Sequence, residues 1–309
     1  MAPTPATLTV RPGRALIATV GGRTIDLGAS TTSNDHARPF LKWTGGKQWL
    51  AAVASSVMPE DFVGRYIEPF LGGGSVFFAV GSRKATLGDM NAELIEAYQG
   101  VRDCPEKVIA ALARYPHDRE FFEAMRRARP RAIHTKAARL IYLNKTAFNG
   151  MYRVNLRGEF NVPFGRYVNP TICDPDRIRR ASHALRGTTL RVGDFAATMK
   201  AAKPGDVVYL DPPYITGHRN NGFLKYNAPL FSWEDQQRLA ALAIRLANRG
   251  VFVIVSNSDH GDVISLYKGF FRYGITRNSL IGGQGSHRGP IQEALLTSTP
   301  IHGVPTHRM

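Results

Sequence analysis

The sequence predicts an α/β fold built on a parallel sheet, and three observations carry this prediction. From about residue 65 onward, short apolar runs alternate with amphipathic stretches. The runs end in glycine-rich or polar clusters, which is where open parallel sheets bind their ligands. Between Asn91 and Gly187 helical patterns replace the apolar runs. We therefore expect a Rossmann-like sheet interrupted by one mainly helical insertion.

Four apolar runs supply the expected strands. They are Tyr66-Ile67, Ala85 to Leu87, Val207 to Leu210 and Val251 to Val255. The first is followed by a glycine-rich turn, and the others by Asp89, Asp211 and Ser256. Because the carboxyl ends of parallel strands share one edge of a sheet, we expect these polar groups to converge.

The patterns divide the chain into three parts. Residues 1–35 are an extension without assigned role, with a hairpin expected from Leu8 to Leu27 through Gly21-Gly22. Residues 36–104 and 188–309 form one discontinuous domain, and residues 105–187 form the inserted domain. Within the insertion, Ile109 to Arg131 and Thr135 to Asn144 are expected to be helical, and Asn149 to Phe164 to form a hairpin.

Composition favours a polyanionic partner. Lys and Arg number 40 against 24 Asp and Glu, and residues 102–187 hold 18 of the former against 8 of the latter. Such an excess favours phosphate contacts with nucleic acid, although a solvated basic face gives the same count.

No apolar run reaches the ~20 residues of a membrane span, and the N-terminus does not resemble a secretion signal, so we expect a cytoplasmic protein. The spacing of Cys104 and Cys173 predicts neither a disulfide nor a metal site.

A glycine-rich segment, Glu68 to Ser75, follows the first expected strand. It does not match a dinucleotide fingerprint, because Phe77 stands where the third glycine belongs. A P-loop is excluded as well, since Gly46-Lys47 is followed by Gln48. Asp89, at the end of the next strand, can accept hydrogen bonds from ribose hydroxyls. These features favour a nucleoside without phosphates, and a turn of glycines with a helix-capping Asp is the alternative.

The segment Phe40 to Lys47 adds an aromatic ring and a cation beside two glycines. Trp43 can stack on a purine or face a cationic ligand, and Lys47 can pair with a carboxylate. A core Trp beside a surface Lys is the alternative interpretation.

The tetrapeptide Asp211-Pro212-Pro213-Tyr214 follows the apolar strand Val207 to Leu210 directly. Two prolines fix φ and donate no hydrogen bond, so the loop presents carbonyls and a carboxylate. Asp211 and the Pro212 carbonyl can accept both N–H groups of an exocyclic amine, and Tyr214 can stack on its base. Such an amine needs positioning rather than a metal or a covalent intermediate when its partner carries a good leaving group. A proline-rich turn is the alternative.

With these motifs in view, the chain resembles the bacterial and phage DNA adenine methylases, the Dam-type family, over roughly residues 38 to 298. Four motifs occur in the order typical of the family's alpha group. The resemblance implies a methyltransferase domain at 36–104 and 188–309 that uses S-adenosylmethionine and no metal. It assigns cofactor contacts to Trp43, Lys47, Phe70, Gly72, Gly74, Asp89 and Asp211, and catalysis to Asp211, Pro212, Pro213 and Tyr214.

The fourth match runs from Leu143 to Tyr167 and corresponds to the family's DNA-recognition hairpin. The resemblance implies DNA-binding roles for Asn149, Arg153, Asn155, Pro163, Arg166 and Tyr167. Arginine can bond a guanine edge with two hydrogen bonds, while neighbouring arginines suit phosphates. A charged surface hairpin is the alternative, and Lys145 to Phe148 departs from the best-known family pattern. Gly282 to Arg288 is expected to be either a basic loop near DNA or a surface turn.

The resemblance implies methyl transfer to the N6 amine of a flipped-out adenine in double-stranded DNA, with GATC as the expected site and a monomer as the expected state. Methylation of RNA adenine or of a cytosine amine is an alternative, since the loop suits any planar exocyclic nitrogen. A DNA-binding protein that keeps the fold without turnover is another, and the intact Asp211 argues against it.

Overall fold

The chain folds into two compact units, each discontinuous in sequence. Unit 1 comprises Met1–Thr31, Ala52–Phe70 and Phe195–Met309, and unit 2 comprises Thr32–Ala51 and Leu71–Asp194. The computed structural model describes residues 6–10, 15–20, 23–29, 37–43, 46, 48–51, 57–59, 62–155, 157–214, 231–277, 291–304, 306 and 308–309.

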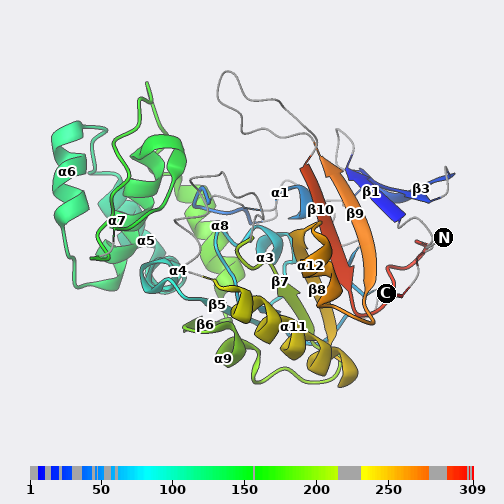
Figure 1. The fold of residues 1–309 in the computed structure, drawn as a ribbon. Helices are drawn as coiled ribbons and strands as arrows, with labels where there is room; N and C mark the ends of the chain where they lie inside the picture. Colours follow the sequence, from blue (N-terminus) through cyan, green and yellow to red (C-terminus); the bar gives the residue numbers. More distant parts are fainter. Residues whose placement is uncertain are drawn as a thin grey trace. The chain divides into compact units, whose positions relative to one another are not determined.

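Unit 1 contains eight strands in the order β3-β2-β1-β9-β10-β8-β7-β4. Strands β4, β7 and β8 run parallel, as the apolar runs predicted. Strands β9 and β10 are consecutive in the chain, pair antiparallel and lie side by side in Figure 1. Strand β10 also pairs antiparallel with β8. The bounds are β1 Ala6–Val10, β2 Ala15–Val20, β3 Arg23–Ala29, β4 Tyr66–Glu68, β7 Val207–Leu210, β8 Phe252–Ser258, β9 Phe271–Arg277 and β10 Ile291–Thr297.

The hairpin expected in the extension is present as β2 and β3. Val20 pairs with Arg23 across Gly21 and Gly22, which themselves lie outside the described residues. Strand β1 pairs antiparallel with β2 and parallel with β9, so the extension adds three strands to the unit 1 sheet.

The core of unit 1 lies around β7, all four residues of which are buried. A strand buried on both faces reads as a continuous apolar run, which explains why the sequence revealed it. Helix α11 packs against β8, and its first turn is fixed by a capping box between Ser232 and Asp235. The helices of this unit with described bounds include α9 Phe195–Met199, α11 Trp233–Asn248 and α12 Gly261–Ser265.

Unit 2 is mainly helical and carries two parallel strands, β5 Ala85–Asp89 and β6 Thr189–Val192. Helix α7 is buried over most of its length and packs against α4, α5 and α6. The helices with described bounds include α1 Gln48–Ala51, α3 Ser75–Val80, α4 Ala92–Asp103, α5 Pro105–Leu112, α6 Arg119–Arg127, α7 Ile133–Thr146, the 3₁₀ turn Phe148–Gly150, and α8 Pro175–Leu185.

One expected helix is two helices. The segment Ile109 to Arg131 divides into α5 and α6, which flank Pro116. Proline disfavours helical backbone before it and cannot donate to a preceding turn. Asp118 then begins α6 by accepting a hydrogen bond from the Phe121 N–H at 2.8 Å. The expected helix near Thr135 to Asn144 is confirmed as α7. Among the described helices, none has the length and apolarity needed to cross a membrane.

Candidate functional site

In unit 2 the glycine-rich loop is tied to the end of β5 by Asp89. Its carboxylate accepts hydrogen bonds from the Gly72 N–H at 3.0 Å and from the Asn91 N–H at 2.9 Å. Burial raises the pKa of Asp89, and the backbone N–H groups of Gly72, Asn91 and Met90 oppose that shift. The Tyr98 hydroxyl donates to the Gly72 carbonyl at 3.1 Å. Asp89 therefore lies beside the loop, as expected for a residue at the end of a neighbouring strand, and its contact with a ribose stays a prediction. The sequence did not single out Tyr98, which also bonds the loop.

Trp43 lies directly against this loop. A Cβ added at Gly72, where φ is +47°, would stand 2.8 Å from Trp43 Cδ1, and one at Gly73 would stand 3.0 Å from Trp43 Cβ. The glycines are therefore needed both for backbone conformation and for the close approach of the indole. The structure brings Trp43, Gly72 and Asp89 together, as their sequence motifs suggested.

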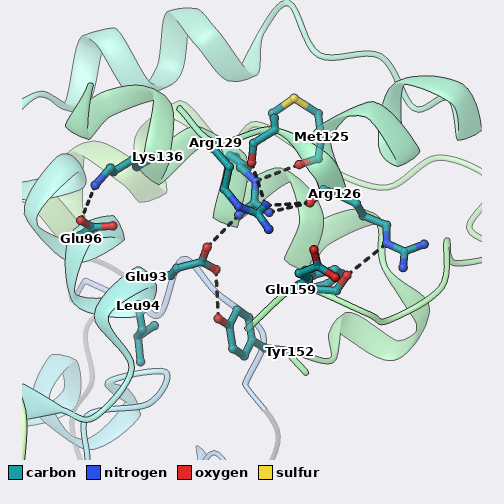
Figure 2. A network of polar contacts seen from close by, with 12 residues as sticks. Glu93, Leu94, Glu96, Met125, Arg126, Arg129, Lys136, Tyr152 and Glu159 are labelled. Atoms are coloured by element: carbon teal, nitrogen blue, oxygen red, sulfur yellow. Dashed lines mark hydrogen bonds and ion pairs between the residues drawn. The ribbon is translucent and has the colours of Figure 1, made fainter. Parts of the chain in front are cut away.

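A second aromatic ring covers Trp43, and it comes from the hairpin segment. The Tyr152 ring stacks on Trp43 with a centroid distance of 5.4 Å and an interplanar angle of 22°. Figure 2 shows the Tyr152 hydroxyl directed at Glu93, to which it donates at 3.0 Å. Burial, followed by the Glu93 charge, raises the pKa of Tyr152 well above its usual value. Arg139, also buried, donates to the other Glu93 oxygen at 3.2 Å.

Phe70, Lys47 and Gly74 are three further residues predicted to bind the cofactor. Phe70 belongs to unit 1, where its ring packs between Phe195 and Phe231 with centroid distances of 5.7 and 5.6 Å. Lys47 lies outside the described residues. Gly74 begins α3 with φ +66°, and a Cβ there would stand 2.8 Å from the Tyr98 hydroxyl oxygen.

The tetrapeptide Asp211–Tyr214 leaves the end of β7 in unit 1. Pro212 is buried, Pro213 is exposed, and Asp211 and Tyr214 are half-buried. The Tyr214 hydroxyl oxygen lies 3.4 Å from Ser256 Oγ, and either atom can donate.

Acidic groups gather beside this loop. Glu68 is buried at the end of β4 and accepts a hydrogen bond from the Tyr66 hydroxyl at 2.9 Å. Burial, then the charges of Glu68 and Asp211, hold the pKa of Tyr66 well above its usual value. Burial and then Asp211 do the same for the pKa of Tyr209. Both tyrosine hydroxyls therefore stay neutral beside the carboxyl groups of Glu68 and Asp211.

The tip of the hairpin in unit 2, Arg153 to Asn161, is held mainly by its own residues. Val154 bridges Phe160, and the Asn155 side chain accepts hydrogen bonds from the Arg157 and Glu159 N–H groups at 2.9 and 3.0 Å. The expected Gly-turned hairpin is therefore present, as isolated bridges around Gly158 rather than as full strands.

Arg153 donates from its Nε atom to the Asn161 side-chain oxygen at 2.8 Å and from its terminal nitrogen to the Asn161 carbonyl at 3.3 Å. The guanidinium thus lies along the hairpin.

The remaining predicted DNA contacts occupy different parts of this segment. Asn149 is exposed and has a positive φ of 53°, which asparagine tolerates better than most residues. The Pro163 carbonyl accepts a hydrogen bond from the Phe148 N–H at 2.9 Å. Arg166 is exposed, and the ring of Tyr167 lies under the Lys42 Nζ atom at 4.8 Å. Lys42 was missed by the sequence reasoning, although it adjoins Trp43.

Metal ligands do not gather in the described part of the chain, where no three His, Cys, Asp or Glu side chains are grouped. Unit 2 presents an aromatic ring, a carboxylate and a glycine loop, and unit 1 presents a stiff loop of hydrogen-bond acceptors beside an aromatic hydroxyl.

Comparison with known proteins agrees with these features. Residues 43–279 match the model of the D12 class N6 adenine-specific DNA methyltransferases. A type II methyltransferase of Lactococcus lactis subsp. cremoris is 39% identical over 273 residues, covering 85% of this chain and 96% of the relative. A type II methyltransferase of Methanocaldococcus jannaschii is 32% identical, covering 82% of this chain and 96% of the relative. DNA adenine methylase of Escherichia coli (strain K12) is 34% identical, covering 72% of this chain and 81% of the relative.

Proposed function

We propose a reaction from one premise: this chain belongs to the D12 class N6 adenine-specific DNA methyltransferases. The reaction is transfer of a methyl group from S-adenosylmethionine to the N6 amine of an adenine that has been flipped out of duplex DNA. The observation that carries the proposal is the Asp211–Tyr214 loop at the end of a fully buried strand. Two of its four residues have no N–H, so the loop can accept hydrogen bonds but scarcely donate them.

Each group of the loop has a role in that reaction. The amine of adenine is a poor nucleophile because its lone pair is delocalised into the ring. The Asp211 carboxylate and the Pro212 carbonyl accept its two N–H groups and direct the nitrogen lone pair outward. A nitrogen–carbon bond would form as the carbon–sulfur bond breaks, so the sulfonium would leave as a neutral thioether and the nitrogen would release one proton to solvent. Positioning of this kind supplies most of the rate.

The methyl donor fits residues of unit 2. S-adenosylmethionine would supply a methyl group on a sulfonium, together with an adenosine to be recognised. Trp43 offers an aromatic face to the donor, and Asp89 offers a carboxylate at the end of β5 beside the glycine loop. Lys47, Gly72 and Gly74 are further proposed donor contacts, together with Phe70 and Asp211.

DNA binding is assigned to the hairpin and to the basic residues around it. Reaching N6 requires the adenine to leave the duplex, at a cost of a few kcal/mol that Tyr214 stacking helps to offset. Asn149, Arg153, Asn155, Pro163, Arg166 and Tyr167 are the proposed DNA contacts, within a recognition domain at 105–187. We propose GATC as the site. Activity on RNA adenine or on a cytosine amine is the second candidate, favoured only by the loop's tolerance of any planar amine.

The test is expression of the chain in bacterial cells that lack adenine methylation, followed by sequencing that detects modified bases. We expect N6-methyladenine within one short motif, GATC if the proposed site is right. A motif other than GATC would correct the site alone. Genomic DNA without modified adenine, from cells that contain folded protein, would overturn the reaction.

A further inference from the structure

A chain of three hydrogen bonds in unit 1 runs from β8 to the catalytic loop. The Ser258 N–H donates to the Asn257 side-chain oxygen at 2.8 Å, and Asn257 Nδ2 donates to Gln236 Oε1 at 3.3 Å. Gln236 Nε2 then donates to the Pro213 carbonyl at 3.2 Å. We call the side chains of Asn257 and Gln236 the amide relay.

The relay has one orientation that satisfies all its partners. The Ser258 N–H group can only donate, so the side-chain oxygen of Asn257 faces it and the side-chain nitrogen of Asn257 faces Gln236. The Pro213 carbonyl can only accept, so the nitrogen of Gln236 faces the loop. Reversing either amide would place two donors or two acceptors against each other in a buried space, where an unpaired polar group costs about 1 to 3 kcal/mol.

Both relay residues are fully buried, each with 0% of its surface exposed, and both come from well-fixed elements. Gln236 lies in the first turn of α11, directly after the capping box. Asn257 lies two residues beyond Val255, which pairs with Leu210 at the end of β7. The relay therefore links the loop to a helix and to the neighbouring strand.

The contact falls on a part of the loop that proline leaves adjustable. Each proline fixes its own φ but not its ψ. The ψ angle of Pro213 decides where its carbonyl points and in which direction Tyr214 leaves the loop. A donor bonded to the Pro213 carbonyl fixes this ψ angle. It also occupies that carbonyl, so the acceptors that remain for the adenine amine are the Asp211 carboxylate and the Pro212 carbonyl.

We propose that Gln236, oriented by Asn257, is a positioning residue for methyl transfer. It fixes the orientation of the Pro213–Tyr214 peptide group, so that the acceptors of the loop and the Tyr214 ring are correctly placed before the base binds. This inference rests on the proposed function.

The test compares Gln236→Met with Gln237→Met. Methionine keeps the length of the side chain and removes the donor, and Gln237 is the adjacent, exposed residue of the same helix. With a duplex substrate we expect Gln236→Met to lower kcat by roughly 10- to 100-fold, while KM for DNA changes by less than about threefold. Gln237→Met should match the wild type in both.

Two further variants separate positioning from stability. Asn257→Leu should lower kcat as well, and the double variant should lose no more than Gln236→Met alone, because Asn257 acts through Gln236. If Gln236→Met fails to fold, Asn257→Leu alone decides, with loss of kcat supporting the relay and wild-type kcat overturning it. Losses that multiply in the double variant would show two independent structural defects and overturn the relay.

A fluorescent readout reports on the loop directly. With 2-aminopurine at the target position, flipping raises the fluorescence, and we expect Gln236→Met to bind the duplex yet hold the flipped base less well. A wild type without methyl transfer would overturn the proposed function itself. An active wild type whose kcat and fluorescence are matched by Gln236→Met would overturn the relay alone.

Discussion

The loop Asp211–Tyr214, which we propose to be catalytic, and the tip of the hairpin, Arg153 to Asn161, are held in different ways. The loop is fixed by buried side chains from distant elements, Gln236 and Ser256 among them. The tip bonds largely within itself, between Asn155 and Glu159 and between Arg153 and Asn161, through groups that are exposed or half-buried. The base of the hairpin contacts other elements, as Tyr152 does with Glu93 and Trp43. The difference suits their proposed tasks, because an amine needs one fixed set of acceptors and a DNA surface needs side chains that can exchange partners. Variants of the loop should therefore lower kcat, and variants of the hairpin should alter binding or sequence choice.

The largest effect is expected for Asp211→Ala. Removing the carboxylate removes one of the two proposed acceptors of the amine and should lower kcat by at least about 10²- to 10³-fold. Transfer of a radiolabelled methyl group to a duplex oligonucleotide measures the loss. The variant's thermal unfolding should match that of the wild type, and turnover retained by a folded variant would refute the role of Asp211.

A smaller loss is expected for Trp43→Ala, because Trp43 contacts both the glycine loop and Tyr152 of the hairpin segment. The variant removes the ring that lies on Gly72 and stacks on Tyr152, and donor binding should weaken by roughly 10-fold. Calorimetric titration with S-adenosylmethionine measures the Kd. Tyr152→Phe is the matched control, since it keeps the stacked ring and loses only the bond to Glu93. Equal Kd values for Trp43→Ala and the wild type would remove Trp43 from the donor site.

Arg153→Ala should relax sequence choice rather than reduce turnover. Its guanidinium has five N–H groups in a planar fork that can bond a guanine edge with two hydrogen bonds, and its contacts with Asn161 hold it along the hairpin. We expect discrimination at one base position to fall by about 1 to 3 kcal/mol. The measurement compares kcat/KM for cognate and single-mismatch duplexes.

Arg157→Ala serves as the control for this experiment. The Arg157 side chain is exposed and suits a phosphate contact. Its removal should therefore weaken binding to all DNA sequences alike and reduce the salt dependence of binding by about one charge. If both arginine variants leave discrimination intact, the hairpin does not read the sequence through Arg153.

The smallest effect is expected for Asn155→Ala. Asn155 bonds the turn at 2.9 and 3.0 Å but is only half-buried, so its loss should loosen the turn locally and cost about 1 kcal/mol or less. KM for DNA should rise by roughly two- to fivefold with kcat unchanged. A fall in kcat with an unchanged KM would contradict the division between loop and hairpin.

Much of the candidate site was visible in the sequence because it consists of short contiguous motifs. Asp89, Gly72 and Trp43 do meet, and β4, β5, β7 and β8 lie where apolar runs indicated. The division of Ile109 to Arg131 into two helices was missed because an amphipathic pattern continues across Pro116. The roles of the individual site residues and the boundaries of the recognition domain stay predictions.

By itself, the sequence determined which strands are buried, which residues follow them and which family they belong to, because periodicity and contiguous motifs are local properties of a chain. Only the tertiary structure decided which side chains support those motifs. Gln236 and Asn257 are 21 positions apart, and Tyr152 lies 109 residues from Trp43. The two amides pair because folding removes both from water, where an unpaired polar group is costly, and the two rings stack because packing brings them together. That pairing depends on packing in three dimensions, and no local pattern of residues records it.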